Sequence, residues 1–515
     1  MVCTDDSDGL GYEVFIVDGI TYESMDGYDV MATFVDTSCG LNVSLPSHID
    51  HGGHTHTVVS IGAGFTSSMD IESLHIPATV TEIVPGALLS SSLSVITVDP
   101  SNTTFHAEGN VLYDDARKSI VRYCPNNSDT TFEIPAGILS IYAYAFHYAI
   151  NLVEISGIPS SIKVIDDFTF CGCESLVRIN YDPLIGMNTL PEGLIYIGRF
   201  AFSLCDSLEQ IVLPDSLVMI DSYAFELNDS IRTIEIPSNV SYIGESVFFS
   251  CSLLENITVA PGNTSYVSLD GVLFQKVNDP VALTLIHYPA MKSETSYVLP
   301  DLVNSIADSA FYGVAHLKSV TFTDKFVTIP KGALFGADSV ESVTLPSTTI
   351  LIDAAAFSGC ASLTTIIGGE SVISIGAWAF EATKLSHPFI PKSLTSIGDY
   401  AFYDCERFVD ITIPSTVKTL GSAVFEYCIN LRTITFEGTD TTLTTESLSI
   451  GYSEFPMGVT VYYHEGLSIP SDVSNEFTNL DFVDLGKEPY PWENLIGVAV
   501  CLLVLFGMFR LFREV

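Results

Sequence analysis

Apolar and polar positions alternate along this chain in a pattern that returns about every 23 residues. The segment LEQIVLPDSLVMIDSYAFELNDS (residues 208–230) is followed directly by IRTIEIPSNVSYIGESVFFSCSL from residue 231. A repeat of this size cannot bury its own apolar face, so it has to stack on its neighbours. The pattern therefore predicts a repeat solenoid: a right-handed, β-rich coil with short turns or helical plugs.

Each repeat contains a recognisable strand pattern. Leu208, Ile211 and Leu213 place three branched side chains on one face of a strand. Pro214 then ends this strand, because proline cannot donate to a ladder. We expect one continuous parallel β-sheet, with strands at residues 208–213, 231–236 and 408–413.

An aromatic or leucine anchor marks the far side of each turn of the coil. Most neighbouring anchors lie 22 to 24 residues apart, and we expect them to be buried in one ladder. The 32-residue gap after Phe170 fits a small insertion around residues 183–188, whereas gaps of 58 and 63 residues follow Leu88 and Phe248. The thirteen anchors are Phe65, Leu88, Phe146, Phe170, Phe202, Phe225, Phe248, Phe311, Leu334, Phe357, Phe380, Phe402 and Phe425.

The two long gaps contain matched segments near residues 100–125 and 261–290. They read PSNTTFHAEGNVLYDDARKSIVRYCP and PGNTSYVSLDGVLFQKVNDPVALTLIHYPA. Each has an Asn-Thr pair, then Val-Leu before an aromatic residue, a turn and a second strand. We expect hairpin inserts that widen one side of the coil.

The ends of the chain depart from the repeat. Residues 1–57 are interpreted as a β-rich N-terminal cap module, in which Asp18-Gly19 and Gly52-Gly53 mark hairpin turns. The solenoid spans 58–436, followed by a C-terminal cap at 437–486 and a juxtamembrane stalk at 487–493. Caps of this kind cover the apolar strand edges that an open coil exposes.

Residues 494–513 form an apolar segment that is expected to be a transmembrane helix. Arg510 and Arg513 lie at its end, where long basic side chains can reach the interface. Basic residues favour the cytoplasmic side, so we expect a single-pass protein with an extracellular solenoid and a cytoplasmic C-terminus. Seven Asn-x-Ser/Thr sequons agree with this orientation: Asn42, Asn102, Asn126, Asn228, Asn239, Asn256 and Asn263.

The first residues, MVCTDDSDGLG, have neither the basic start nor the apolar core of a signal peptide. Two explanations are open. Either a leader precedes this sequence, or the protein is tail-anchored with its solenoid in the cytosol.

Six cysteines share one position, three residues after the anchor. Other repeats hold Ala, Asn, Val or Thr there, so the position favours a small side chain, and a buried free Cys packs as a small hydrophobe. We expect buried thiols; disulfides between stacked repeats, such as Cys405 with Cys428, are the alternative. The six are Cys173, Cys205, Cys251, Cys360, Cys405 and Cys428.

The chain is strongly acidic, with 62 Asp and Glu against 20 Lys and Arg and a formal charge of −42. Binding to phosphate backbones depends on clustered basic residues, so nucleic acid is excluded as a partner. An acidic surface attracts cations such as calcium, but we favour the simpler interpretation that the charge serves as a hydrated exterior.

The residues that could carry chemistry are few. His48, His51, His54 and His56 lie close in sequence, and His54 and His56 face the same way on a predicted strand. A zinc or copper site is conceivable there, but we favour a polar hairpin. Known catalytic motifs are not found. We therefore predict a protein that is not an enzyme and has no cofactor and no metal.

Binding is expected on the strand face, at positions between the inward-facing residues. These positions are mostly small and polar, and they name no ligand. They include Gln210, Thr233, Glu235, Ser319, Thr321, Ser342, Thr344, Asp410, Thr412 and Thr433.

Segments such as IPSNVSYIGESVFFSCSLLENITV and IPKSLTSIGDYAFYDCERFVDITIP resemble the BspA-type leucine-rich repeat. The inserts resemble that family's DGVLY…IRYP element, and VDGITYE near the start fits as well, so the resemblance covers most of residues 12–485. It implies a surface protein of host-associated microbes or protists that adheres to host proteins, matrix or other cells.

The leading hypothesis is a membrane-anchored adhesin or interaction protein that binds a protein or glycan through an extended face. The alternatives are a structural component of the cell envelope that binds its own kind, or an intracellular scaffold if the solenoid is not exported. A carbohydrate-active enzyme would need a carboxylate pair in a cleft, which the pattern does not supply.

Overall fold

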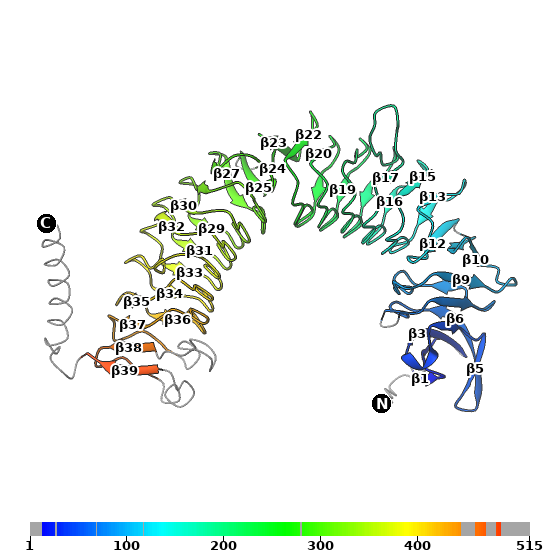
Figure 1. The fold of residues 1–515 in the computed structure, drawn as a ribbon, viewed down its shortest axis with the longest axis horizontal. Helices are drawn as coiled ribbons and strands as arrows, with labels where there is room; N and C mark the ends of the chain where they lie inside the picture. The colour runs from blue at the N-terminus through cyan, green and yellow to red at the C-terminus, as the bar shows by residue number, and fades with distance from the viewer. Residues whose placement is uncertain are drawn as a thin grey trace, which may run out of the picture. The chain divides into compact units, whose positions relative to one another are not determined.

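The computed structural model describes residues 13–25, 28–67, 70–116, 118–278, 281–443, 459–469 and 480–485. The chain divides into two compact units: unit 1 (Met1–Glu294 with Leu302–His316) and unit 2 (Thr295–Asp301 with Leu317–Val515). Within each unit, short strands from successive repeats stack edge to edge, as Figure 1 shows. The chain is a β-solenoid, as the repeat period predicts.

Unit 1 begins with a mixed sheet in the order β1-β2-β3-β6-β5. The Asp18-Gly19 pair, with positive φ at both residues, turns β1 into β2, and Gly52-Gly53 turns β5 into β6. Both expected hairpin turns are therefore confirmed. The strands are β1 (Val14–Val17), β2 (Ile20–Ser24), β3 (Asp29–Val35), β5 (His48–His51) and β6 (His54–Ile61), and the 3₁₀ helix η1 spans Thr37–Cys39.

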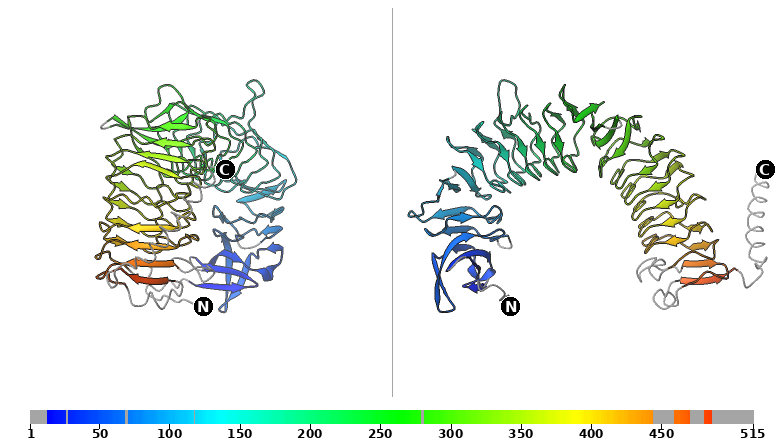
Figure 2. Two further views of the ribbon diagram at one scale, coloured as in Figure 1. Left: turned by 60° about the vertical axis from the view of Figure 1, so that its left-hand side comes forward. Right: turned by 180° about the vertical axis from the view of Figure 1, so that it is seen from behind.

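The repeats of unit 1 contribute two parallel ladders on two sides of the coil, which Figure 2 shows from behind. The long-strand ladder contains β4 (Asn42–Ser44), β7 (Ser73–Ile76), β9 (Val95–Val98), β13 (Thr131–Glu133), β15 (Glu154–Ser156), β17 (Arg178–Ile179), β20 (Thr233–Ile236) and β22 (Asn256–Val259). The short-strand ladder contains β8 (Glu82–Ile83), β14 (Ser140–Ile141), β16 (Val164–Ile165), β18 (Tyr196–Ile197), β19 (Met219–Ile220), β21 (Tyr242–Ile243) and β27 (Val303–Ile306).

Unit 2 repeats this arrangement. Its long-strand ladder contains β26 (Ser296–Val298), β28 (Ser319–Thr321), β30 (Ser342–Leu345), β32 (Thr365–Gly368), β35 (Asp410–Ile413), β37 (Thr433–Phe436), β38 (Val459–Tyr463) and β39 (Leu480–Asp484). Its short-strand ladder contains β29 (Thr328–Ile329), β31 (Leu351–Ile352), β33 (Ser374–Ile375), β34 (Ser396–Ile397) and β36 (Thr419–Leu420).

The expectation of one continuous sheet is wrong. In place of the strand expected at residues 208–213 there is an isolated bridge between Thr189 and Val212, and the Asn188 side chain bonds the backbone on both sides of it. In unit 2 the ladder breaks between β32 and β35. The intervening segment contains Pro388, which has no N–H to donate to a rung.

The anchors are buried and stacked, as expected. Phe225 lies between Phe202 and Phe248, with ring centroids 5.4 and 6.0 Å away. The anchor segments are turns rather than helical plugs. Residues two before and two after the anchor, such as Tyr223 and Leu227, have positive φ, which breaks a right-handed helix.

The two inserts are complete repeats that carry a hairpin. Tyr123 and Tyr288 take the place of the anchor, each 23 residues before the next Phe, and stack on it at 5.4 and 5.1 Å. The expected hairpins are confirmed, but these two anchors were not predicted. The strands are β10 (Phe105–Glu108), β11 (Val111–Asp114), β12 (Ser119–Tyr123), β23 (Tyr266–Leu269), β24 (Val272–Asn278) and β25 (Val281–His287).

The expected membrane helix at 494–513 and the stalk at 487–493 lie outside the described residues. Within the part of the chain that the structure describes, no helix combines the length and hydropathy needed to cross a bilayer.

Candidate functional site

The predicted strand-face residues of unit 2 line up in register. Ser319 on β28 pairs with Ser342 on β30, and Thr321 pairs with Thr344. These four side chains are partly exposed, while the valines between them, Val320 and Val343, are buried. The alternation places small hydroxyls in rows across neighbouring strands.

A second row lies on β35 and β37. Asp410 pairs with Thr433, and the Thr433 hydroxyl donates to the Asp410 carboxylate at 2.7 Å. Thr412, which is exposed, pairs with Thr435. These side chains support one another, so the row presents an ordered polar surface.

The predicted residues of unit 1 form a smaller group. Thr233 and Glu235 are exposed on β20 and pair with Asn256 and Thr258 of β22. Gln210 is exposed but lies outside any strand, because the ladder is broken there. The predicted site is therefore three short polar rows rather than one.

The six predicted cysteines are buried free thiols, as expected. Each thiol also donates to the backbone carbonyl of the anchor in the preceding repeat. For example, Cys251 Sγ lies 3.1 Å from the carbonyl oxygen of Phe225. Asn228 fills the same position and donates to the Phe202 carbonyl at 2.7 Å. A polar Asn in this position was the sequence signal for a hydrogen-bonding role, and the small-residue interpretation missed it. The other five thiols, Cys173, Cys205, Cys360, Cys405 and Cys428, bond in the same way.

The histidines of the N-terminal module pack on aromatic rings. His51 stacks on Phe15 with centroids 4.0 Å apart, and Tyr28 lies against His54 and His56. His48 hydrogen-bonds Ser47. Across the residues described here, no group of three or more His, Cys, Asp or Glu is placed to hold a metal ion.

Sequence reasoning missed a row of partly exposed aromatic side chains in the turns that carry the anchors. In unit 1, Tyr144, Phe168, Phe200 and Tyr223 stack in order, with centroid separations of 4.7 to 4.8 Å. All four stand two residues before an anchor, at positive φ. The aromatic repeat two residues before the anchor was the signal in the sequence.

In unit 2 the corresponding cluster contains Trp378, Tyr400, Tyr403 and Tyr427. Trp378 stacks on Tyr400 with centroids 4.2 Å apart. Burial and then the neighbouring Tyr427, Glu426 and Asp404 raise the pKa of Tyr403. Aromatic rings beside carboxylates are suited to contacts with cationic side chains.

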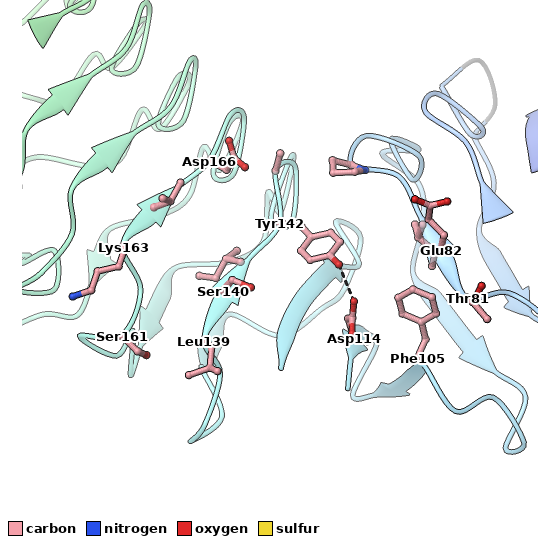
Figure 3. A pocket seen from close by; sticks show the side chains of 15 residues that line it. Thr81, Glu82, Phe105, Asp114, Leu139, Ser140, Tyr142, Ser161, Lys163 and Asp166 are labelled. Atoms are coloured by element: carbon pink, nitrogen blue, oxygen red, sulfur yellow. Dashed lines mark hydrogen bonds between the residues drawn. The ribbon is translucent and has the colours of Figure 1, made fainter. Parts of the chain in front are cut away.

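A groove of about 550 Å³ lies beside the first insert (Figure 3). Figure 3 shows Asp114 and Phe105 between the strand that carries Glu82 and the strand that carries Ser140. The Tyr142 hydroxyl donates to the Asp114 carboxylate at 2.8 Å, and this bond holds two lining side chains of the groove together. We call this the first-insert groove; the rest of its lining is Thr81, Ile83, Pro85, Leu139, Ile141, Ala143, Ser161, Lys163, Val164 and Asp166.

The asparagines of several sequons make hydrogen bonds that join neighbouring repeats. Asn102 and Asn263 occupy matched positions in the two inserts, and each amide donates to two carbonyls of the preceding repeat. Asn228 is fully buried. Asn42, Asn126 and Asn239 are exposed, and the extracellular placement of the solenoid stays a prediction.

The sequence matches a protein family described as the BspA type leucine-rich repeat region, over residues 118–185, 184–270, 288–348 and 327–450. A search among curated proteins finds no significant match.

Several solved structures are similar to this chain. A leucine-rich cell surface protein from Faecalibacterium prausnitzii is 24% identical, with a TM-score of 0.47 over 85% of this chain and 97% of its own. The pneumococcal vaccine antigen PcpA is 19% identical, with a TM-score of 0.43 over 92% and 99%. A leucine-rich repeat protein from Bacteroides ovatus is 23% identical, with a TM-score of 0.37 over 82% and 94%.

Proposed function

The chain belongs to the family with the BspA type leucine-rich repeat region, and we propose that it is a membrane-anchored surface protein that binds a protein or glycan on a host or neighbouring cell. Its family is a repeat family, which presents a long surface for binding rather than a catalytic cleft. The anchor is the apolar segment 494–513, with the solenoid outside the cell and the C-terminus in the cytoplasm.

The observation that carries the binding face is the register of its polar residues. Ser319 with Ser342 and Asp410 with Thr433 repeat similar chemistry in neighbouring strands. A ligand that itself repeats, such as a glycan chain or a fibrous protein, can engage several of these rows at once. Several weak contacts on one ligand then give a higher overall affinity than any of them alone.

The aromatic cluster around Trp378 supports a second contact surface, for a protein partner. Trp and Tyr are enriched among the residues that dominate binding energy in protein interfaces. The Trp378–Tyr400 stack holds two such rings in place.

This function is tested by measuring the binding of full-length protein to three surfaces. They are immobilised matrix extract, a glycan array and an immobilised layer of the protein itself. Thr412→Arg and Ser342→Arg each place a long charged side chain on the strand face, and we expect each to weaken binding about 10-fold or more. Ser371→Arg adds the same charge at an exposed turn and is the matched control.

The outcomes separate the hypotheses. If Trp378→Ala and Tyr400→Ala lose binding and the strand-face variants do not, the ligand contacts the aromatic cluster rather than the strand face. Binding only to the protein itself would support a structural envelope component. Binding to none of the three surfaces would contradict an adhesive role.

The topology is tested with protease added to intact cells. We expect the repeats to be removed while the C-terminal tail stays protected. If the repeats survive until the membrane is permeabilised, the protein is tail-anchored and an intracellular scaffold becomes the better interpretation.

A further inference from the structure

We propose that the first-insert groove binds an extended, basic segment of a partner protein, which adds as a strand to the unpaired edge of β8. This site lies on the short-strand side of unit 1, in residues 81–166. This proposal does not depend on binding at the strand face, so an experiment can contradict either proposal without contradicting the other.

The argument begins with the edge of β8. One side of β8 pairs with β6, where the Val84 N–H donates to the Ile61 carbonyl at 2.9 Å. Neighbouring residues of a parallel strand direct their backbone groups to opposite sides, so the N–H and C=O of Ile83 point away from β6. Among the described residues, none bonds the N–H or C=O of Ile83 or the C=O of Thr81.

The following repeats show which backbone groups bond to an edge of this kind. At the matching position of β18, the Met219 N–H donates to the Ile195 carbonyl at 3.2 Å, and the Asp221 N–H donates to the Ile197 carbonyl at 2.9 Å. The edge of β8 offers the same backbone groups, but the insert replaces the rung that would follow. A peptide main chain supplies the matching N–H and C=O at strand spacing.

The second insert provides an internal comparison. Tyr266 begins β23 as Phe105 begins β10. Their backbone N–H groups donate to the side-chain oxygens of Asn263 and Asn102, at 2.8 and 2.9 Å. The Tyr266 hydroxyl accepts the N–H of Ile243 at 2.7 Å, the group that matches the N–H of Ile83. Phe105 has no hydroxyl. The second insert therefore supplies an acceptor for this N–H internally, whereas the first insert leaves the Ile83 N–H for another acceptor.

The charge of the groove selects the occupant. Among the described residues that line the groove, Glu82, Asp114 and Asp166 are acidic and Lys163 is basic. A basic residue in the added strand is therefore favoured over an acidic one. The residue that follows would point toward Ile83 and Phe105, where an apolar side chain fits.

The probe is the peptide fluorescein-Ile-Lys-Ile-Gly-Thr-amide, which carries the label on its N-terminal amine and keeps a free lysine side chain; it is titrated against full-length protein by fluorescence anisotropy. We expect saturable binding. It should weaken about 10-fold when the backbone nitrogen of the lysine is methylated, because one backbone hydrogen bond is then lost. Glu in place of Lys in the peptide should also weaken binding. No saturable binding up to millimolar peptide would overturn the proposal, as would equal affinity for the methylated peptide.

The decisive variant is Phe105→Tyr, because its added hydroxyl should cap the Ile83 N–H as Tyr266 caps Ile243. We expect this variant to fold, since Tyr occupies the matched position, and to lose peptide binding by about 10-fold. Tyr266→Phe is the control and should leave the affinity at the first insert unchanged. Unaltered binding by Phe105→Tyr would overturn the proposal, and so would a groove that binds oligosaccharides but not the peptide.

Discussion

The thiol of Cys251 donates a hydrogen bond to the carbonyl oxygen of Phe225, with Sγ and O 3.1 Å apart. The two residues belong to successive repeats, so the bond joins one turn of the coil to the next. The same bond recurs at five other cysteines and, through an amide, at Asn228. Cysteine in this position therefore supplies both a small apolar volume and a donor.

Replacing Cys251 by Ala should lower the free energy of unfolding by about 1–3 kcal/mol, because the buried Phe225 carbonyl loses its thiol donor. Cys251→Ser keeps a donor of similar size, so it should lose less than the Ala variant. Urea unfolding followed by circular dichroism measures both. Equal losses in the two variants would mean that the hydrogen bond contributes nothing to stability.

The buried thiols should also be slow to alkylate. Burial raises the pKa of Cys251 to about 12, so at pH 8.5 its thiol stays protonated, and only the thiolate reacts. We expect iodoacetamide to label Cys39, which is partly exposed, before Cys251 or Cys360. Mass mapping of labelled peptides at increasing times gives the order. Fast labelling of Cys251 in folded protein would contradict its burial.

The repeat itself was readable from the sequence, because one register places the same side-chain types in every turn. Ile234 and Phe225 are buried where the pattern puts them, and β20 and β35 begin two residues later than expected. The breaks in the sheet were less visible. They depend on the Asn188 side chain taking over backbone bonds and on Pro388, and both act through local geometry rather than hydrophobic period.

The Phe225 anchor should be one of the most costly side chains to truncate. Phe225→Ala leaves a cavity between Phe202 and Phe248 and should cost about 3–5 kcal/mol. Tyr223→Ala, in the same turn but partly exposed, is the matched control and should cost less. Hydrogen exchange should show the loss of protection concentrated in neighbouring repeats, because each repeat contacts only its neighbours. A uniform loss along the chain would contradict this.

The candidate sites were harder to predict than the fold. The polar rows follow from strand alternation, which is why Ser319 and Ser342 could be chosen from the sequence. The groove beside the first insert could not, because it depends on which backbone groups the hairpin leaves unpaired. The difference between Phe105 and Tyr266 has meaning only once the two inserts are aligned in space.

His287 should make the stability of the protein depend on pH. It is buried on β25, and burial lowers its pKa to about 4 from an ordinary value of 6.5. Between these values the unfolded chain binds a proton that the folded chain does not, so stability falls as the pH falls from 6.5 to 4. His287→Leu removes this group, and the gap between wild type and variant should change by about 3 kcal/mol over that range. The exposed His316, changed to Leu, is the control. Urea unfolding at several pH values decides the matter: parallel curves for wild type and His287→Leu would show that His287 titrates normally in the folded protein.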